Sequence, residues 1–187
     1  MTPPLVAVTA PSSVTAPAAW RGMRAADLSA VIAIAARVHP DYPEDAAVFG
    51  ERLALCPAGC LVLEGAGGPD GYVLSHPWRD DAPPALNVAL GALPARPDCW
   101  YLHDIALLPH ARGRNAPAAA LAMLAARARK AGLSRIVLVA TGSAGAYWHR
   151  AGFTALDRPR AAAILRSYDP AARLMSRAVG PEGPRTD

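Results

Sequence analysis

The chain has 187 residues, of which 52% are hydrophobic and 18% charged, and its formal net charge is +4. This length and apolar content suit one globular domain with a hydrophobic core. The positive charges are scattered, and no run of lysine and arginine carries interleaved aromatic residues, so the sequence argues against a nucleic-acid partner.

The cysteines and the hydropathy pattern exclude further classes of protein. No apolar run approaches the roughly 20 residues of a membrane-spanning helix, so we expect no membrane partner. The three cysteines, Cys56, Cys60 and Cys99, lack the spacing of a disulfide framework, which favours reduced thiols and a cytoplasmic location. No second ligand pair with zinc spacing follows Cys56 and Cys60, so we expect no metal site.

The two ends of the chain differ in composition from the middle. Residues 1–18 are rich in Pro, Ala, Ser and Thr and lack the basic segment of a signal peptide, which is typical of a disordered leader. We expect a second disordered segment at 179–187. A single domain is expected to cover 19–178.

Hydrophobic periodicity and turn residues divide that domain into strands and helices. In chain order they are a strand at 20–24, helices at 25–39 and 44–56, strands at 59–65, 70–78 and 99–108, a helix at 117–130, a strand at 134–140, a helix at 142–152, and strands at 153–158 and 161–168. The proline-rich segment 79–98 stays unassigned, and loops of this length are often functional. The order predicts an α/β (α+β) fold: a mixed, mostly antiparallel central sheet of about six to seven strands, flanked by about four helices.

The turn "ARGRNAP" at 111–117 connects a predicted strand to a predicted helix. A helix N-terminus offers unpaired backbone N–H groups and the positive end of the helix dipole, which together form an anion site. Arg112 and Arg114 add positive charge, and Gly113 allows the backbone to approach a ligand closely. Two interpretations remain open from the turn alone: a phosphate-binding site, or an ordinary connection with exposed arginines.

The stretch "LHDIALLPHARGRNAPAAAL" (102–121), followed by "YWHRAGF" (147–153), resembles the GNAT superfamily of acyl-CoA-dependent N-acyltransferases. The predicted order of elements is also that of the superfamily. The resemblance implies a single GNAT-like domain with acetyl-CoA as co-substrate. It also implies that main-chain groups at the end of the strand, Ile105, Ala106 and Leu107, pair with the pantetheine arm.

In the superfamily, a segment of the form Arg/Gln-x-x-Gly-x-Gly/Ala binds the coenzyme A pyrophosphate through its main-chain amides. The resemblance carries this role onto the residues Arg112, Gly113, Arg114, Asn115, Ala116, Pro117 and Ala118. Two positions depart from the pattern. Asn115 replaces the first signature glycine, although asparagine tolerates a left-handed backbone well. Pro117 replaces the second small residue and has no N–H, which removes one donor from the site.

Acyl transfer to an amine requires a proton acceptor, which we expect to be His103, because histidine titrates near neutral pH. The phrase "YLHDIAL" resembles the corresponding strand of arylalkylamine N-acetyltransferases, in which two histidines of this strand act as bases. His103 matches the second of them and Tyr101 stands at the first. Asp104 matches a common glutamate and serves either as base or to orient a neighbour. Strand alternation places Tyr101 and His103 on one face and Asp104 on the other, unless a bulge intervenes. The alternative for His103 is a structural histidine within the sheet.

The general acid is the weaker part of the resemblance. Many members carry a tyrosine where this chain has Trp148, whose indole N–H cannot act as an acid near neutral pH. Either Tyr147 takes that role, or the thiolate leaves without a dedicated acid. Trp148 then packs on the thioester or in the core. Ser143 is expected to donate a hydrogen bond to the pantetheine.

These residues lead us to expect an N-acetyltransferase that moves an acetyl group from acetyl-CoA to a primary amine by direct ternary-complex transfer. The acceptor, a small molecule or a peptide, would bind between 39–45 and 79–98, near Tyr42, Trp78 and Tyr101, at a rim bearing the acids Asp41, Glu44, Asp45, Asp80 and Asp81. The alternative is a non-catalytic sensor of coenzyme A or acyl-CoA. A dinucleotide-binding enzyme is disfavoured, because "RGRNAP" lacks the three-glycine pattern. We expect a monomer or a homodimer.

Overall fold

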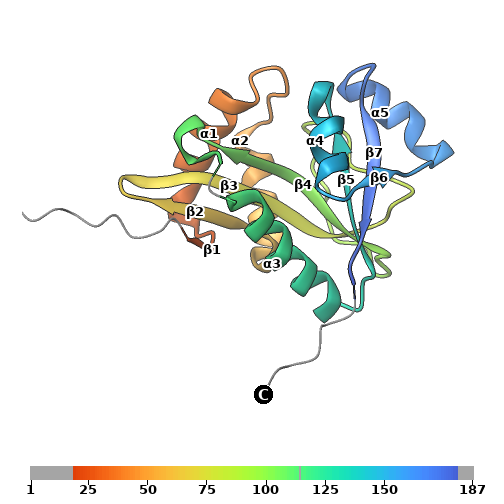
Figure 1. The fold of residues 1–187 in the computed structure, drawn as a ribbon, viewed down its shortest axis with the longest axis horizontal. Helices are drawn as coiled ribbons and strands as arrows, with labels where there is room; N and C mark the ends of the chain where they lie inside the picture. The colour runs from red at the N-terminus through yellow and green to blue at the C-terminus, as the bar shows by residue number, and fades with distance from the viewer. Residues whose placement is uncertain (1–18, 114, 181–187) are drawn as a thin grey trace, which may run out of the picture.

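The computed structural model describes residues 19–113 and 115–180, folded around one seven-stranded sheet (Figure 1). The leader expected at 1–18, the residues 181–187 of the expected tail, and Arg114 lie outside the described residues. Within the part of the chain that is described, no helix is long and apolar enough to cross a membrane.

The sheet is mixed and mostly antiparallel, as the sequence predicts. Its strands lie in the order β1-β2-β3-β4-β5-β7-β6, and β4 and β5 form its parallel pair. The strands are β1 (Trp20–Gly22), β2 (Leu61–Gly65), β3 (Gly68–Trp78), β4 (Cys99–Leu107), β5 (Arg135–Ala140), β6 (Thr154–Ala155) and β7 (Arg173–Ala178).

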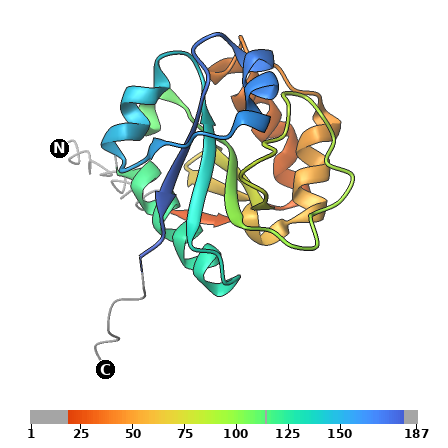
Figure 2. The same ribbon diagram turned by 90° about the vertical axis from the view of Figure 1, so that its right-hand side faces the viewer.

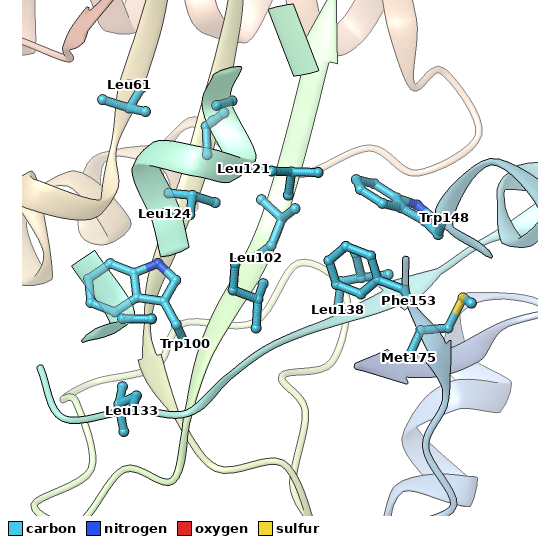
Figure 3. Close-up of a cluster of buried hydrophobic side chains, with 14 of the residues drawn as sticks. Leu61, Trp100, Leu102, Leu121, Leu124, Leu133, Leu138, Trp148, Phe153 and Met175 are labelled. Carbon is cyan, nitrogen blue, oxygen red and sulfur yellow. The ribbon is translucent and has the colours of Figure 1, made fainter. Parts of the chain in front are cut away.

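Helices cover both faces of the sheet (Figures 1 and 2). On one face lie α1 (Leu28–Val38), α2 (Ala46–Leu55) and α5 (Ala162–Tyr168), and on the other lie α3 (Ala116–Lys130) and α4 (Gly145–Arg150). The α3 face holds the largest apolar cluster, shown in Figure 3. There Leu121 and Leu124 of α3 pack over Trp100 and Leu102 of β4, while Trp148 lies beside Phe153.

The C-terminal part of the fold differs from the prediction in two elements. The segment 161–168, expected to be a strand, is α5, preceded by a single helical turn at Pro159–Ala161. Its sequence "AAAILRSY" is dominated by strong helix formers, and Pro159 suits the start of a helical turn, so the local preference is helical. The strand that completes the sheet is β7, which the sequence pattern did not reveal, and it separates β5 from the short β6.

Two irregularities of β4 create the space for a site. First, the register against β3 shifts between Leu74 and Ser75: Leu74 pairs with Asp104 and Ser75 with Leu102, so His103 is an extra, bulged residue. Second, β4 and β5 pair only at Trp100↔Ile136 and Tyr101↔Val137. Beyond these pairs the two strands diverge, and the edge of β4 that faces β5 is left without a neighbouring strand.

Candidate functional site

The divergence of β4 and β5 opens a cavity of about 650 Å³. One wall is β4 from Leu102 to Leu107, and the opposite wall includes Leu138 and Val139 of β5. Tyr147 and Trp148 of α4 close a third side. Because β5 does not pair with this part of β4, the main-chain groups of β4 have no partner strand on that side, although the carbonyl oxygens of Ile105 and Leu107 have side-chain partners in His39 and Arg112. Ile105, Ala106 and Leu107, which the resemblance assigns to pantetheine, all line the cavity.

The turn before α3 forms one end of the same cavity. Gly113 and Asn115 have positive φ angles of 85° and 56°, so Asn115 adopts the left-handed conformation that a glycine usually supplies. The first α-helical bond joins the N–H of Ala119 to the carbonyl oxygen of Asn115 at 3.1 Å. The amides that precede it, including those of Ala116 and Ala118, therefore have no partner within the helix.

The residues of this turn differ in whether they face the cavity. Arg112, Gly113 and Pro117 line the cavity. The Nε of Arg112 donates to the carbonyl oxygen of Leu107 at 3.3 Å, which anchors this arginine to the end of β4. Ala116 is buried beneath the turn, and Ala118 points to solvent. Arg114 lies outside the described residues, so its expected contribution stays a prediction.

A second, smaller cavity of about 80 Å³ lies beside the first. Its lining is mostly polar and comprises His39, Tyr42, Glu44, Leu86, Tyr101, His103, Asp104, Val139, Thr141 and Tyr168. Five of these residues also line the larger cavity: His39, His103, Asp104, Val139 and Thr141. The two cavities therefore meet at the bulge of β4.

His103 and Glu44 form a buried pair at this meeting point. The Nε2 of His103 lies 3.0 Å from Oε2 of Glu44, and their side chains are only 2% and 6% exposed. Burial by itself raises the pKa of Glu44, but the hydrogen bonds from His103 and from the backbone N–H of Asn87 outweigh it and hold that pKa below its usual value. An ionised carboxylate can only accept, so Nε2 of His103 carries the proton of the pair. The Nδ1 of His103 is buried without a hydrogen-bond partner.

Asp104 forms a second pair of the same kind with His39, the residue that directly follows α1. The Nε2 of His39 lies 3.2 Å from Oδ1 of Asp104, and the Tyr72 hydroxyl donates to the other carboxylate oxygen. Burial by itself raises the pKa of Asp104, yet the hydrogen bonds from His39 and Tyr72 hold it below its usual value. His103 and Asp104 thus both face the α1–α2 connection, because the bulge interrupts strand alternation between them.

The aromatic residues of α4 occupy different environments. Trp148 is buried in the apolar cluster, where its ring packs edge-on against Phe153, and it also forms part of the cavity wall. Tyr147 is 41% exposed and lines the same cavity, and partial burial raises the pKa of its hydroxyl. Ser143, at the start of this helical region, lines the cavity as well.

The residues expected to bind the acceptor separate into two groups. Tyr42 and Tyr101 line the small cavity, where the Tyr42 hydroxyl donates to Asp169 at 2.7 Å. Trp78 lines neither cavity, and its indole N–H donates to the carbonyl oxygen of Ala82.

The expected acidic rim is likewise divided. Asp80 is buried in ion pairs with Arg135 and Arg158, and Asp81 pairs with Arg79. Glu44 is the acid of that rim that lies inside the site.

Three polar residues of the small cavity are not among the site residues named from the sequence: His39, Thr141 and Tyr168. Their positions depend on the packing of the α1–α2 connection and α5 against β4, which no local sequence pattern encodes. The nearest signal was the grouping of polar and aromatic residues in "HPDYPED". Among the described residues, no group of three or more His, Cys, Asp or Glu side chains is arranged to hold a metal ion.

Comparison with known proteins agrees with this fold. Similar solved structures include the loading GNATL domain of CurA from Lyngbya majuscula (TM-score 0.69, 13% identity, covering 86% of this chain and 97% of that one). The GNAT-like decarboxylase GphF in complex with isobutyryl-CoA is also similar (TM-score 0.68, 19% identity, covering 87% and 100%). A third is the ribosomal-protein-S18-alanine N-acetyltransferase from Escherichia coli (TM-score 0.59, 18% identity, covering 90% and 98%).

No curated protein sequence matches the chain significantly. The model of the acetyltransferase (GNAT) family, however, matches residues 27–153. That range contains β2 to β5, the turn before α3 and both histidine–carboxylate pairs. The chain therefore belongs to the acetyltransferase (GNAT) family.

Proposed function

We propose that the protein is an N-acyltransferase that moves an acetyl group from acetyl-CoA to a primary amine by direct transfer within a ternary complex. The observation that carries this proposal is the meeting of the larger cavity and the small polar cavity at His103. The larger cavity, of about 650 Å³, offers the unpaired main-chain edge of β4 to an acyl-CoA, and the small cavity has the size and polarity for an amino group.

Acyl-CoA binding is assigned to the larger cavity. The pyrophosphate would lie on the turn before α3, where free amides, Arg112 and the helix dipole favour an anion. The pantetheine arm would lie along Ile105–Leu107, with Ser143 and Trp148 on the opposite side. In this arrangement the thioester would lie between His103 and Tyr147. The GphF structure holds isobutyryl-CoA, so a branched acyl group is a reasonable second donor to test.

The chemistry follows from the protonation of the two side chains nearest the thioester. Attack of the amine on the thioester carbonyl gives a tetrahedral intermediate whose nitrogen carries an extra proton. The imidazole of His103, held by Glu44 through Nε2, accepts that proton at Nδ1, directly or through one water. Collapse of the intermediate breaks the C–S bond. Tyr147, whose hydroxyl is protonated at neutral pH and whose pKa burial raises further, donates its proton to the departing sulfur. The imidazolium of His103 then returns the proton of the nitrogen to Tyr147, so that the net result is one proton moved from nitrogen to sulfur.

The acceptor is assigned to the small cavity. Its volume of about 80 Å³ accommodates an amino group with a few carbon atoms, so a larger acceptor would enter by its end. The carboxylates of Glu44 and Asp104 lie in its lining, which favours a cation. Both a small primary amine and a peptide amine satisfy these conditions. The E. coli enzyme named above acts on an alanine of a ribosomal protein, which makes short peptides a useful part of any panel.

The experiment is calorimetric titration of acetyl-CoA, followed by a thiol-release assay with cationic amines and short peptides on the same sample. Saturable binding with turnover that falls by about 10²-fold or more in His103→Ala would support the proposal. Isobutyryl-CoA in the same assay tests the acyl preference. Binding without turnover on any amine would favour the alternative, a sensor of acyl-CoA. Absence of binding at millimolar ligand would contradict both.

A further inference from the structure

Protonation of the acceptor means that its nitrogen must lose two protons during transfer, by two different routes. At neutral pH a primary amine is an ammonium ion, since its pKa is close to the ~10.4 of lysine. Transfer from a thioester gives an amide, the thiol of coenzyme A and one proton. The nitrogen therefore loses two protons: one leaves before attack and ends in water, and the other leaves after attack and ends on sulfur. This inference rests on the proposed N-acyltransferase function.

The site contains two imidazole–carboxylate pairs, and they differ in their access to water. His103 pairs with Glu44 at 3.0 Å and is 2% exposed, whereas His39 pairs with Asp104 at 3.2 Å and is 32% exposed. Both histidines line both cavities. The side chain of His39 is therefore in contact with bulk water, whereas that of His103 is enclosed by the site.

The contacts of His39 fix its protonation pattern. Its Nε2 lies 3.2 Å from the Asp104 carboxylate and 3.4 Å from the carbonyl oxygen of Ile105. Both partners can only accept, so Nε2 carries the hydrogen and Nδ1 of the neutral ring holds the free lone pair. Asp104 already accepts hydrogen bonds from His39 and Tyr72, so this carboxylate orients the ring rather than taking the substrate proton.

We propose that His39 is a second catalytic base, which takes the first proton from the bound ammonium and releases it to water, with Asp104 as its positioning residue. The N–H bond of the ammonium breaks, its electron pair stays on nitrogen, and the proton joins Nδ1 of His39. The neutral amine then attacks the thioester carbonyl. His103 removes the second proton, which ends on the sulfur of coenzyme A.

The charged groups that act on the pKa of His39 are Asp104 on β4 and Arg112 in the turn before α3. Its other titratable neighbours are His103, Tyr42 and Glu44 in the lining of the small cavity, and Tyr72, which donates to Asp104. Burial by itself lowers the pKa of His39, and the hydrogen bond to Asp104 outweighs it, so the pKa is raised. The ring therefore binds a substrate proton more firmly than a free imidazole does.

The test compares His39→Gln, His103→Gln and the control His149→Gln, whose histidine is exposed on α4 outside both cavities. Each is assayed by thiol release from acetyl-CoA with a cationic acceptor, such as benzylamine, and with aniline, which is already neutral at pH 7. For His39→Gln we expect kcat/KM at pH 7 to fall about 10²-fold with the cationic amine and to change less than about threefold with aniline. His103→Gln should lose activity with both acceptors, and His149→Gln with neither.

The pH profile provides the second readout on the cationic amine alone. Without His39 the enzyme can use only the fraction of the amine that is already neutral in solution. The loss of kcat/KM in His39→Gln should therefore shrink by about tenfold per pH unit as pH rises towards the pKa of the amine. A loss that is independent of pH, or no loss, would overturn the assignment to His39 and leave the proposed function intact. If His39→Gln does not fold by circular dichroism, Asp104→Asn replaces it and should show the same pH-dependent deficit. A wild type that turns over no amine would contradict the proposed function itself.

Discussion

His103 and Asp104 are adjacent in the chain, yet both side chains reach the α1–α2 connection. In a regular strand neighbours point to opposite faces, so this arrangement requires the extra residue that the bulge inserts. Because of the bulge, β4 contributes one member to each of two neighbouring histidine–carboxylate pairs. Each carboxylate fixes Nε2 of its histidine and leaves Nδ1 as the acceptor.

Glu44→Gln tests the pairing around His103 with a change of charge but almost none of shape. The amide cannot stabilise the imidazolium that forms during transfer, so we expect kcat to fall by on the order of 10²-fold. The dissociation constant for acetyl-CoA should stay the same, because Glu44 lines the small cavity and not the larger one. Steady-state kinetics and calorimetry on one preparation measure both quantities. Equal losses in affinity and rate would indicate a distorted fold instead.

At the residue scale, sequence reasoning reached His103 and Asp104 through the family motif but could not choose their orientation. Alternation predicts opposite faces, and only the register of β4 against β3 shows the bulge. His39 lies 64 positions before His103 in the sequence, and packing between α1 and β4 brings it to the site. Contacts between elements so far apart are not encoded in local periodicity.

Among the elements, the turn before α3 retains its conformation despite its altered sequence. Asn115 takes up the left-handed backbone, but Pro117 occupies the first turn of the helix and lines the cavity without an N–H to offer. Glycine and proline in the first turn are both compatible with a helix start, so the departure affects ligand contacts more than the fold.

Pro117→Ala should restore a donor to this turn. A hydrogen bond to a charged acceptor contributes about 1.5–3 kcal/mol, so we expect the dissociation constant for acetyl-CoA to fall by about tenfold or more. Calorimetric titration measures it, with Pro159→Ala, in the helical turn before α5, as a matched control that should not change the affinity. An unchanged affinity in Pro117→Ala would mean that the amide of residue 117 faces away from the pyrophosphate.

The helices and strands up to α4 follow the periodicity of the sequence, with shifts of a few residues at their ends. The error at 161–168 has a physical cause. A short apolar run fits the periodicity of a strand as well as that of a helix, and here the alanine-rich composition favours the helix. The strand β7, "RLMSRA", has only two fully buried apolar side chains, Leu174 and Met175. Its place between β5 and β6 comes from sheet pairing and not from its own pattern.

At the scale of the whole molecule, one buried carboxylate, that of Asp80, anchors the long loop 79–98 to distant parts of the chain. Asp80, at the start of 79–98, is 8% exposed and pairs with Arg135 of β5 at 2.9 Å and with Arg158, after β6, at 2.6 Å. It also lies near Asp98, whose side chain accepts from the Asp80 backbone N–H at 2.8 Å. These contacts fasten the start of the loop to β5 and to the segment that follows β6, and Asp80, Arg135 and Arg158 line neither cavity.

Asp80→Asn should therefore lower stability without changing the chemistry. Two partly exposed arginines lose a charged partner, so we expect the free energy of unfolding at pH 7 to fall by about 1.5–3 kcal/mol. The hydrogen bond from Arg158, opposed by burial, holds the pKa of Asp80 below its usual value. A depressed carboxyl pKa stabilises the fold above the unfolded value of about 3.9, and this contribution is lost as pH falls through the folded pKa. The difference from wild type should accordingly be constant between pH 5 and 8 and shrink below pH 4.

Urea denaturation across that pH range measures the effect, and Asp81→Asn is the matched control. Asp81 pairs with Arg79 and Arg160, whose side chains are well exposed, and exposed ion pairs add little to stability. Acetyl transfer by Asp80→Asn at 25 °C should match the wild type, since Asp80 lines neither cavity. A stability deficit that persists unchanged below pH 4 would place its origin in packing of the loop rather than in the charge of Asp80.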